Sequence, residues 1–467
     1  MQNKLVRGLI AVGVGALIWL APMPAGVKPQ AWHLFAVFVS TIFGFILQPL
    51  PIGSIAFISI TFTALAGILK PGEALSGFSN SVIWLIVSAF LFAKGFIKTG
   101  LGRRIALVIM RAIGDSTLKL GYAMVLSDLV IAPATPSNTA RGGGILFPIV
   151  KSLSLAFDSQ PGPTARKVGA YLMKTTFQGD VVTAAMFMTA CAPNPLIVLL
   201  AQKTLNISLS WGQWAAAAAV PGALSLLIIP YLLYKIYPPE ITRTPEAKAY
   251  AAQELEKMGP MSFGEKVVGG VFLMALALWA TSNINKLDAT VVAMLGVSVM
   301  MITRVLTWSD VLEEKGAWDT MIWMGSLIGL ADYLSKLGFI GWFAKTVSGA
   351  IAGIAWLPAL MLLLAVYMYS HYGFASLAAH VTAMYAAFCA VAAAAGAPAY
   401  MAALALAYIS NLMGGLTHYA TGPAPIFFGA GYVDQGTWWK LGFVISIVNM
   451  ILWVGVGSIW WKVLGLW

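Results

Sequence analysis

A short polar cluster near position 140 contains side chains suited to binding an anion. The stretch ATPSNTARGGGILFP, residues 134–148, carries Ser137, Asn138, Thr139 and Arg141 among apolar neighbours. Their hydroxyl, amide and guanidinium groups donate hydrogen bonds, and the guanidinium adds a full positive charge. A charge buried in a membrane protein usually marks function because it is costly unless paired. The alternative is that Arg141 reaches the membrane surface as an interfacial residue.

The composition is that of a membrane protein. Of 467 residues, 60% are hydrophobic and 10% charged, whereas a soluble domain has about 25% charged residues. Runs of about 20 apolar residues, enough for a helix to cross a bilayer, recur along the chain. The net charge is +11, but the basic residues are not accompanied by the aromatic residues of a nucleic-acid-binding surface. No nucleic-acid partner is therefore expected. Cys191 and Cys389 lie in apolar surroundings, and no disulfide is expected.

These runs predict an all-α polytopic protein with about eleven spans and two re-entrant hairpins. The first hairpin covers 118–156, where Ser137–Thr139 separates apolar flanks too short to span; irregular backbone is tolerated there only if protein or water surrounds it. The second covers 355–394. The sequences CAPNP (191–195) and ATGPAP (420–425) each interrupt a span. Other spans are expected at 8–22, 31–49, 53–69, 80–112, 167–202, 211–237, 266–281, 287–303, 319–346 and 439–460.

The basic residues predict the orientation of the chain in the membrane. Ten of the 28 lysines and arginines fall on one side in this topology: Lys4, Arg7, Arg103, Arg104, Arg111, Lys151, Arg166, Lys167, Arg243 and Lys248. The positive-inside rule makes that side cytoplasmic. We therefore expect a protein of the inner (plasma) membrane with a cytoplasmic N-terminus and an external C-terminus. Residues 9–26 also resemble a secretory signal peptide, but a first span anchored by Lys4 and Arg7 explains them as well.

An internal repeat gives the polar cluster a counterpart. Trp84 and Trp323 begin similar sequences 239 residues apart, and the same shift places Ser137 on Ser376 and Arg141 on His380. Further along the chain, CAPNPLI overlays TGPAPIF, which pairs Pro193 with Pro423 and Pro195 with Pro425. An odd number of crossings separates the halves, so the repeats are expected to be inverted, a plan found in secondary transporters. The expected parts are scaffold spans at 1–79, a first repeat at 80–237, a cytoplasmic linker at 238–265, scaffold spans at 266–318 and a second repeat at 319–467.

The chain resembles the divalent anion/sodium symporter family in two motifs, SNTARGGG and GGLTHYATGPAPIFF. These motifs are most similar to the exchanger branch of the family, which includes bacterial citrate, tartrate and 2-oxoglutarate antiporters and the plastid 2-oxoglutarate/malate translocator. The resemblance implies a homodimer with a scaffold domain and a transport domain that moves like an elevator. It also implies substrate-binding residues at two hairpin tips and in two unwound helix segments. They are Ser137, Asn138 and Thr139 (first tip), Ser376, Leu377 and Ala378 (second tip), Cys191, Ala192, Pro193 and Asn194 (first unwound segment), and Thr421, Gly422, Pro423 and Ala424 (second unwound segment).

The second tip departs from the sodium-coupled pattern of that family. Leu377 and Ala378 replace the asparagine amide and threonine hydroxyl that help to coordinate sodium. Arg141 and His380 stand four residues after the two serines, and we expect their charges to compensate a dicarboxylate in place of cations. His380 as a hydrogen-bonded core histidine is the alternative.

Six other titratable residues lie in apolar surroundings, and each has an expected role. His418 is a possible site residue because it precedes the second unwound segment, whereas His371 is expected at the membrane interface and His33 in a structural role. Asp128, Asp180 and Asp332 either carry protons or, as is more common, pair with a lysine or arginine.

The sequence therefore predicts a sodium-independent antiporter of di- or tricarboxylates such as succinate, malate, 2-oxoglutarate, tartrate or citrate, with membrane lipids around it. The alternative is a sodium-coupled dicarboxylate symporter. No cofactor or metal is expected. An intramembrane hydrolase is disfavoured because nucleophile-elbow and zinc-ligand spacings are missing, and a channel because no continuous polar pore is indicated.

Overall fold

The computed structural model describes residues 2–339, 341–343, 346 and 355–467, and within these ranges the chain is helical, without strands. The all-α prediction is confirmed. The main helices are α1 (Gln2–Leu20), α2 (Pro29–Leu47), α3 (Ile52–Leu65), α4 (Pro71–Ala74), α5 (Ser81–Thr99), α6 (Leu101–Ile113), α7 (Thr117–Ile131), α8 (Phe147–Ala156), α9 (Gly169–Met186), α10 (Pro193–Leu205), α11 (Trp211–Ile236), α12 (Pro245–Met258), α13 (Phe263–Ala280), α14 (Ser282–Asn285), α15 (Ala289–Ile302), α16 (Trp308–Glu313), α17 (Lys315–Lys336), α19 (Trp356–Ser370), α20 (Leu377–His380), α21 (Ala386–Ala394), α22 (Ala399–Leu412), α23 (Ala424–Gly429), α24 (Gln435–Asn449) and α25 (Gly457–Val463).

Several of these helices are long and apolar enough to cross a membrane, which makes the chain a multi-pass membrane protein. In the described part of the chain they are Pro29–Leu47, Ser81–Thr99, Thr117–Ala134, Trp211–Ile236, Phe263–Ala280, Leu377–Ala394 and Gln435–Val463. Ile52–Leu65, Ala289–Ile302 and Ala399–Gly415 are shorter apolar helices.

Two expected long spans are bent, so the prediction of single spans at 80–112 and 319–346 was wrong. The first consists of α5 and α6, joined at Gly100, whose φ of +79° is accessible to glycine at little cost. In the second, α17 ends at Lys336 and Gly338 has a φ of +87°. Residues 340 and 344–345 of that predicted span lie outside the described part. Both bends therefore use a glycine in the left-handed region.

Beyond the first bend, α6 is an amphipathic helix and not part of a span. Its apolar face is buried, whereas Arg103 and Arg111 are exposed, the pattern of a helix at a boundary between apolar and polar surroundings. It packs against α12, where Arg103 pairs with Glu254 at 2.6 Å. The nearby helix α16 is tied to the end of α5 by Lys98 and Asp310. Burial alone would raise the pKa of Asp310, but bonds from Lys98 and Thr307 outweigh it and lower that pKa to about 2.

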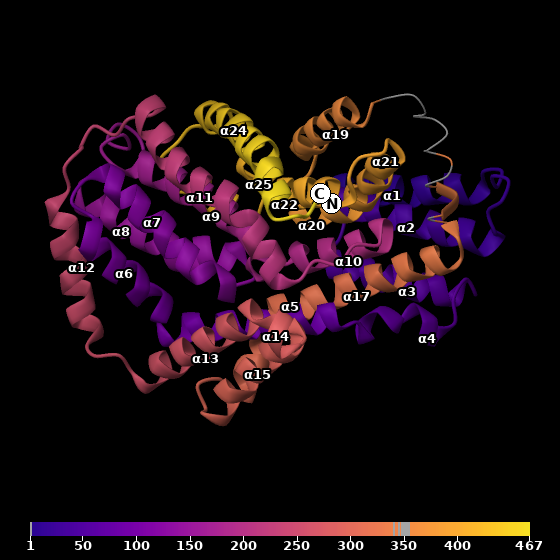
Figure 1. Ribbon diagram of the computed structural model, residues 1–467, viewed down its shortest axis with the longest axis horizontal. Helices are drawn as coiled ribbons and strands as arrows, with labels where there is room; N and C mark the ends of the chain where they lie inside the picture. Colours follow the sequence, from indigo (N-terminus) through magenta and orange to yellow (C-terminus); the bar gives the residue numbers. More distant parts are fainter. Residues whose placement is uncertain (1, 340, 344–345, 347–354) are drawn as a thin grey trace.

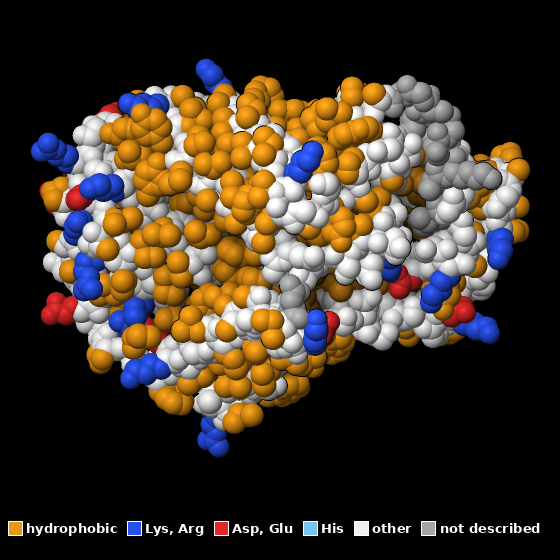
Figure 2. Space-filling view, viewed as in Figure 1, with side chains coloured by type: hydrophobic (Ala, Val, Ile, Leu, Met, Phe, Trp, Pro, Cys, Tyr) orange, Lys and Arg blue, Asp and Glu red, His pale blue; other side chains and the backbone are white. Residues whose placement is uncertain are grey.

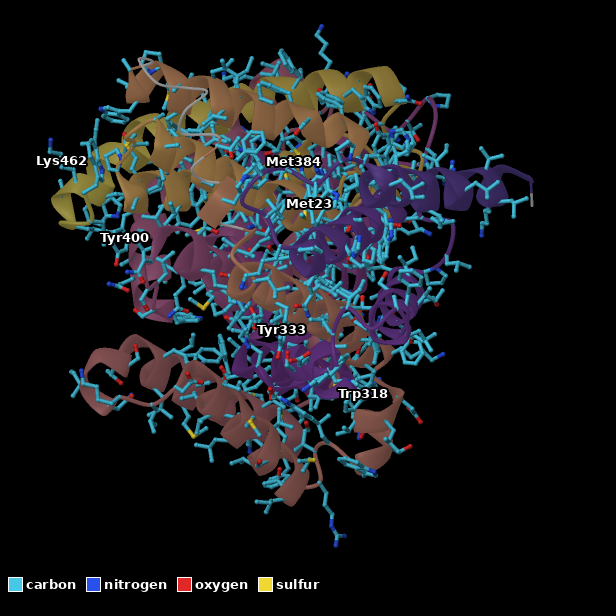
Figure 3. All side chains as sticks on the ribbon, turned by 90° about the vertical axis from the view of Figure 1, so that its right-hand side faces the viewer. Met23, Trp318, Tyr333, Met384, Tyr400 and Lys462 are labelled. Carbon is cyan, nitrogen blue, oxygen red and sulfur yellow. The ribbon has the colours of Figure 1, made fainter. Side chains whose placement is uncertain are left out.

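The helices form a bundle around two buried elements, α9 and α22 (Figure 1). All the residues of α9 are buried, and it packs against α7, α8, α11 and α22. The helices α5 and α17 cross the middle of the molecule and contact each other, and α17 also contacts α3. The pair α13 and α15 packs on α5 and stands apart from the rest, as the end-on view also shows (Figure 3). The helices α9 and α22, which the predicted unwound segments follow, thus lie in the centre of one bundle.

Apolar side chains cover the broad face of the molecule, and charged ones gather at its ends (Figure 2). The end that carries α6 and α12 holds many of the lysines and arginines visible in this view. Leu273, Val291 and Ile302 are among the exposed apolar residues of α13 and α15. In a protein that crosses a membrane, such a face meets lipid or a partner of similar character.

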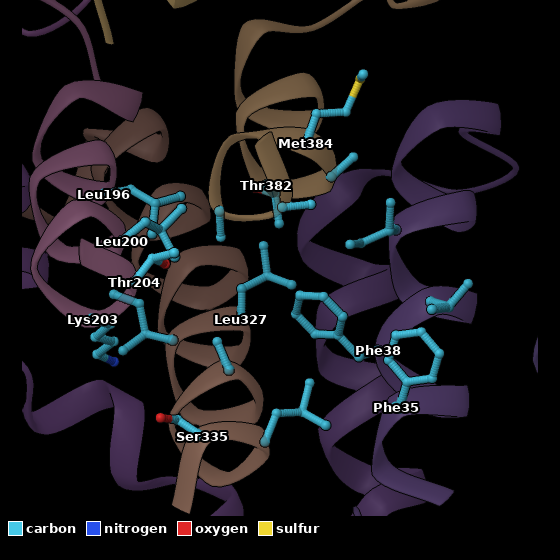
Figure 4. Close-up of a pocket in the computed structure, with 18 of the residues that line it drawn as sticks. Phe35, Phe38, Leu196, Leu200, Lys203, Thr204, Leu327, Ser335, Thr382 and Met384 are labelled. Carbon is cyan, nitrogen blue, oxygen red and sulfur yellow. The ribbon is translucent and has the colours of Figure 1, made fainter. Parts of the chain in front are cut away.

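An apolar hollow of about 460 Å³ separates α2 and α17 from α10 and the second hairpin (Figure 4). Phe35 and Phe38 of α2 point into it opposite Leu196 and Leu200 of α10, with Leu327 of α17 between them. Most of the lining is apolar; its polar members are Lys203, Thr204, Ser335 and Thr382, and Lys203 pairs with Asp332. The hollow therefore lies at a largely apolar interface between two groups of helices.

Candidate substrate site

The first hairpin reverses direction at its polar tip. Helix α7 ends at Ile131, Thr135 is extended, and helical structure resumes at Thr139 as a π-helix (Thr139–Leu146) that leads into α8. Ser137 Oγ accepts a hydrogen bond from the backbone N–H of Ala140 at 3.2 Å. The serine thus satisfies one of the free N–H groups with which every helix begins.

The second tip is built in the same way. Ser376 Oγ accepts a hydrogen bond from the N–H of Ala379 at 3.4 Å at the start of α20. A π-helix (Val381–Tyr385) again follows. Helices that begin at the two tips direct unpaired N–H groups and the positive ends of their dipoles toward the tips, which suits an anion.

The two unwound segments interrupt the buried helices α9 and α22. Phe187 and Cys191 are extended, and α10 begins at Pro193. Between α22 and α23, the chain from Leu416 to Pro423 is not an α-helix. Both breaks therefore lie inside the bundle, where water is scarce and backbone groups need protein partners.

The structure brings the first tip against the second unwound segment, 283 residues further along the chain. Asn138 Nδ2 donates a hydrogen bond to Thr421 Oγ1 at 2.8 Å, and both side chains are almost fully buried. Thr139 Oγ1 lies so close to Gly422 that a Cβ atom at this glycine would overlap it. The predicted site residues Asn138, Thr139, Thr421 and Gly422 thus form one cluster of polar and backbone groups.

The second tip reaches the same unwound segment through Gly414. A side chain at Gly414 would contact both Thr421 and Leu377, so these two residues lie on either side of one glycine. Leu377 is buried, whereas Ser376 and Ala378 are half-buried. Leu377 and Ala378 contribute no polar side-chain group here, as their types require.

Asn194 does not offer its side chain to a ligand, contrary to expectation. Its Nδ2 donates to the carbonyls of Ala184 and Phe187 at 2.9 and 3.0 Å, and its Oδ1 accepts from Asn411 Nδ2 at 2.7 Å. The amide therefore ties the end of α9 to the start of α10 and to α22. Its neighbours Cys191 and Pro193 are buried and Ala192 is half-buried; in the second unwound segment Pro423 and Ala424 are buried, whereas Gly422 is exposed.

Arg141 lies deep in the protein, which rules out the interfacial alternative. Its guanidinium is fully buried, with Nε 2.7 Å from Asp128 Oδ1 and Nη2 3.0 Å from Asp180 Oδ1. Nη1 also donates to the carbonyls of Thr135 and Ala190 at 2.9 and 3.0 Å. A buried guanidinium requires such partners because desolvation is costly.

The expectation that Arg141 compensates the substrate charge needs correction. Two carboxylates of the protein already face this guanidinium, so the departure of a substrate would not leave it unpaired. The alternative expectation for Asp128 and Asp180, pairing with an arginine, is the one observed. Asp332 likewise pairs with Lys203, across the interface between α17 and α10.

His380 is buried but faces another histidine and no carboxylate. Its Nδ1 lies 2.9 Å from Nδ1 of His371, and the two rings are nearly parallel. His371 is completely buried, so its predicted interfacial position was wrong. Its pairing with His380 was not predicted, because nine residues and a chain reversal separate the two histidines.

The remaining histidines differ in their surroundings. His418 is half-buried, and its Nδ1 accepts a hydrogen bond from Trp439 Nε1 at 3.0 Å beside the second unwound segment. His33 stacks on Trp19 with ring centroids 4.0 Å apart, far along the chain from the tips, which agrees with a structural role. The described residues contain no cluster of three histidine, cysteine or acidic side chains that could hold a metal ion.

Buried polar tips, interrupted core helices and apolar spans define the class of a membrane transport protein. A family model described as "Sodium:sulfate symporter transmembrane region" matches residues 2–467. The chain therefore belongs to this family, the divalent anion/sodium symporters, and the predicted resemblance is confirmed.

Its relatives are named as transporters and membrane proteins. A protein of Bacillus subtilis (strain 168) with a proposed malate transport activity is 52% identical over 99% of this chain and 97% of its own. The chloroplastic dicarboxylate transporter 1 of Spinacia oleracea is 48% identical over all of this chain and 83% of its own. An inner membrane protein of Escherichia coli (strain K12) is 37% identical over 99% and 98%.

A solved structure supports the fold alone. The YdaH transporter of Alcanivorax borkumensis matches with a TM-score of 0.58 over 98% of both chains, at 12% identity. The family and the relatives place the protein among dicarboxylate transporters and not among enzymes.

The Arg141 cluster predicts a large loss of stability when its cation alone is removed. Arg141→Gln leaves Asp128 and Asp180 buried without a counter-ion, which costs about 3–5 kcal/mol. Adding Asp128→Asn and Asp180→Asn should restore part of this loss, because the uncompensated carboxylates are then gone. Thermal unfolding of the detergent-purified proteins measures the effect.

Lys119→Gln is the matched control, since it removes a cation from the exposed pair with Asp115. Its melting temperature should stay close to that of the wild type. An Arg141→Gln protein as stable as this control would show that the buried cluster does not stabilise the fold.

Proposed function

We propose that this protein is a sodium-independent exchanger of di- or tricarboxylates in the inner (plasma) membrane. The support for binding is the meeting of the first tip with the second unwound segment, where Asn138, Thr139 and Thr421 offer donors next to helix N-termini. Hydrogen bonds to a carboxylate are charge-assisted and stronger than neutral ones. The relatives named above include a proposed malate transporter and a dicarboxylate transporter.

The single observation that carries sodium independence is the occupation of backbone oxygens behind each tip. Hard cations take oxygen ligands. Here the carbonyl of Ala190 accepts a hydrogen bond from Arg141, and the carbonyl of Ala420 lies 2.8 Å from Nε2 of His371. Oxygens that already accept hydrogen bonds from basic side chains are poor ligands for an added cation. The engagement of these two carbonyls by the protein's own N–H groups supports sodium independence.

The electrical cost of moving a dianion across an energised membrane supports exchange over uniport. Each elementary charge moved against the membrane potential costs about 2.3 kcal/mol per 100 mV, so a dianion without co-transported cations costs about 4.6 kcal/mol. Exchange of one dianion for another moves no net charge and avoids this cost. Arg141 is not part of this argument, because its charge is balanced within the protein.

We further propose an elevator movement and a homodimer. The apolar hollow and the Lys203–Asp332 pair lie between α10 and the second hairpin on one side and α2 and α17 on the other. An interface made largely of apolar contacts can slide without leaving many buried polar groups unpaired. The exposed apolar residues of α13 and α15 favour a second copy or lipid as their partner.

The transport mode predicts a specific result in proteoliposomes. With the membrane potential clamped at zero by potassium and valinomycin, vesicles preloaded with unlabelled malate should take up labelled malate equally in sodium and in potassium buffer. Empty vesicles should take up little in either buffer. Uptake of the label over time is the measurement, and protein-free vesicles are the control.

The alternative functions give different outcomes in the same experiment. Sodium-dependent uptake into empty vesicles would support the sodium-coupled symporter. Sodium-independent uptake into empty, clamped vesicles would support uniport and contradict exchange.

The site predicts a loss of substrate affinity in Asn138→Ala. The variant removes the amide that bonds Thr421 and faces the second unwound segment, and a hydrogen bond to a charged group is worth about 1.5–3 kcal/mol. The KM for malate exchange should therefore rise roughly tenfold or more. Asn285→Ala removes a comparable amide bond, to the carbonyl of Leu278 between α13 and α15, and should leave KM unchanged. An unchanged KM in purified Asn138→Ala would remove this residue from the site.

The proposed orientation, with the 238–265 linker inside and the C-terminus outside, predicts where an impermeant maleimide reacts in intact cells. Both native cysteines are buried, so a new exposed cysteine reports its own position. Leu464→Cys should react from outside, whereas Ala249→Cys on α12 should react only after permeabilisation. The reverse pattern would invert the topology.

A further inference from the structure

Each half of the chain connects its hairpin to the carbonyl just before its own unwound segment. Pro193 and Pro423 are 230 residues apart, and the same shift relates Ala190 to Ala420. In the first half the connection is direct, because Arg141 Nη1 donates to the carbonyl of Ala190 at 3.0 Å. A long side chain spans the distance from hairpin to unwound segment in one step.

In the second half the connection takes two steps. His380 occupies the place of Arg141 in the repeat but has a shorter side chain. Its Nδ1 meets Nδ1 of His371 at 2.9 Å, and Nε2 of His371 meets the carbonyl of Ala420 at 2.8 Å. Two imidazoles in series thus reach the carbonyl that one guanidinium reaches in the first half.

The hydrogen-bond partners determine which ring nitrogens carry protons. A carbonyl oxygen only accepts, so Nε2 of His371 must carry a hydrogen. In a neutral ring its Nδ1 is then an acceptor, and the hydrogen between the two rings must belong to Nδ1 of His380. Nε2 of His380 is left as an acceptor and faces Ser370 Oγ at 3.4 Å.

The surroundings favour a neutral pair. The repeat shifts of 239 and 230 residues place Tyr367 and Ser410 where the first half has Asp128 and Asp180. Tyr367 and Ser410 bond each other at 2.8 Å, and Phe374 stacks on His380. No described contact of either histidine is with a carboxylate. An imidazolium here would be a buried charge without a partner.

We infer that His371 is a positioning residue that fixes the tautomer of His380 and ties the second hairpin to the unwound segment at Thr421 and Gly422. Thr421 in turn accepts the bond from Asn138 of the first tip. The relay therefore sets the position of a group at the centre of the proposed site, without touching the substrate itself. Its effect on transport rests on the proposed function, whereas its proton arrangement does not.

The proton arrangement is tested by nitrogen-15 NMR of histidine-labelled protein. The chain has four histidines, and a His33→Phe/His418→Phe variant leaves only the pair. We expect two neutral rings, one protonated at Nε2 and one at Nδ1. Two rings of the same tautomer, or an imidazolium at neutral pH, would overturn the relay.

The positioning role is tested by exchange kinetics of two variants. His371→Phe keeps an aromatic ring but cannot bond Ala420 or His380, and KM should rise roughly three- to tenfold with a smaller change in maximal rate. His371→Gln supplies both a donor and an acceptor and should recover most of the affinity. His33→Phe, the same substitution at a ring stacked on Trp19, should leave KM unchanged.

The outcomes separate the relay from the proposed function. Wild-type KM in a folded His371→Phe protein, or failure of the glutamine variant to rescue it, would contradict the positioning role. If His371→Phe does not fold, the NMR result on the histidine pair still decides the relay. If malate is not a substrate at all, the kinetic arm fails for every variant including the wild type, while the tautomers stand.

Discussion

The arrangement of this protein depends on satisfying backbone groups where two core helices break inside an apolar bundle. Each break frees carbonyls and N–H groups that cannot reach water, and an unpaired backbone group buried in hydrocarbon costs several kcal/mol. Side chains supply the missing partners. Asn194 bonds the carbonyls that end α9, and Arg141 and His371 bond those before the two unwound segments. The same need thus determines which polar residues lie in the core.

The two halves meet this need with different charges. The first half uses a guanidinium and two carboxylates, and all three are fully buried. The second half has Tyr367 and Ser410 in place of the carboxylates and a histidine pair in place of the arginine. Loss of the acids and loss of the full cation go together, because either change alone would leave a buried charge unpaired. The halves share geometry without sharing electrostatics.

Much of the fold was predictable because it follows from local sequence. Apolar runs located the helices, and polar residues within apolar flanks located the tips. The bend at Gly100 was missed although Lys98 and Arg103 flank it, because a glycine alone does not mark a bend in a chain that has 46 glycines. The internal repeat identified the partners Ser376 and His380 correctly as equivalents, since a shared offset is visible without any structure.

The missed parts of the site depend on packing between distant elements. Asp128 and Asp180 come to Arg141 from two different helices, and their sequence positions do not reveal that they share one cation. The assignment of a free charge to Arg141 failed for this reason. His371 was missed because the repeat gives it an alanine, Ala132, as its equivalent. Only the difference in reach between arginine and histidine explains why a second ring is needed there.

A site whose fixed charges are balanced within the protein has a consequence for the direction of transport. Neither half gains or loses a cation of its own when a substrate leaves. In the proposed cycle, therefore, no sodium gradient drives transport. The gradient of the counter-substrate then supplies the driving force, and net flux of one acid requires the opposite flux of another. In the proposed site, the donors near Asn138 and Thr421 would bind carboxylates, which the acids on both sides of the membrane share. Selectivity among these acids must therefore come from the remainder of each molecule.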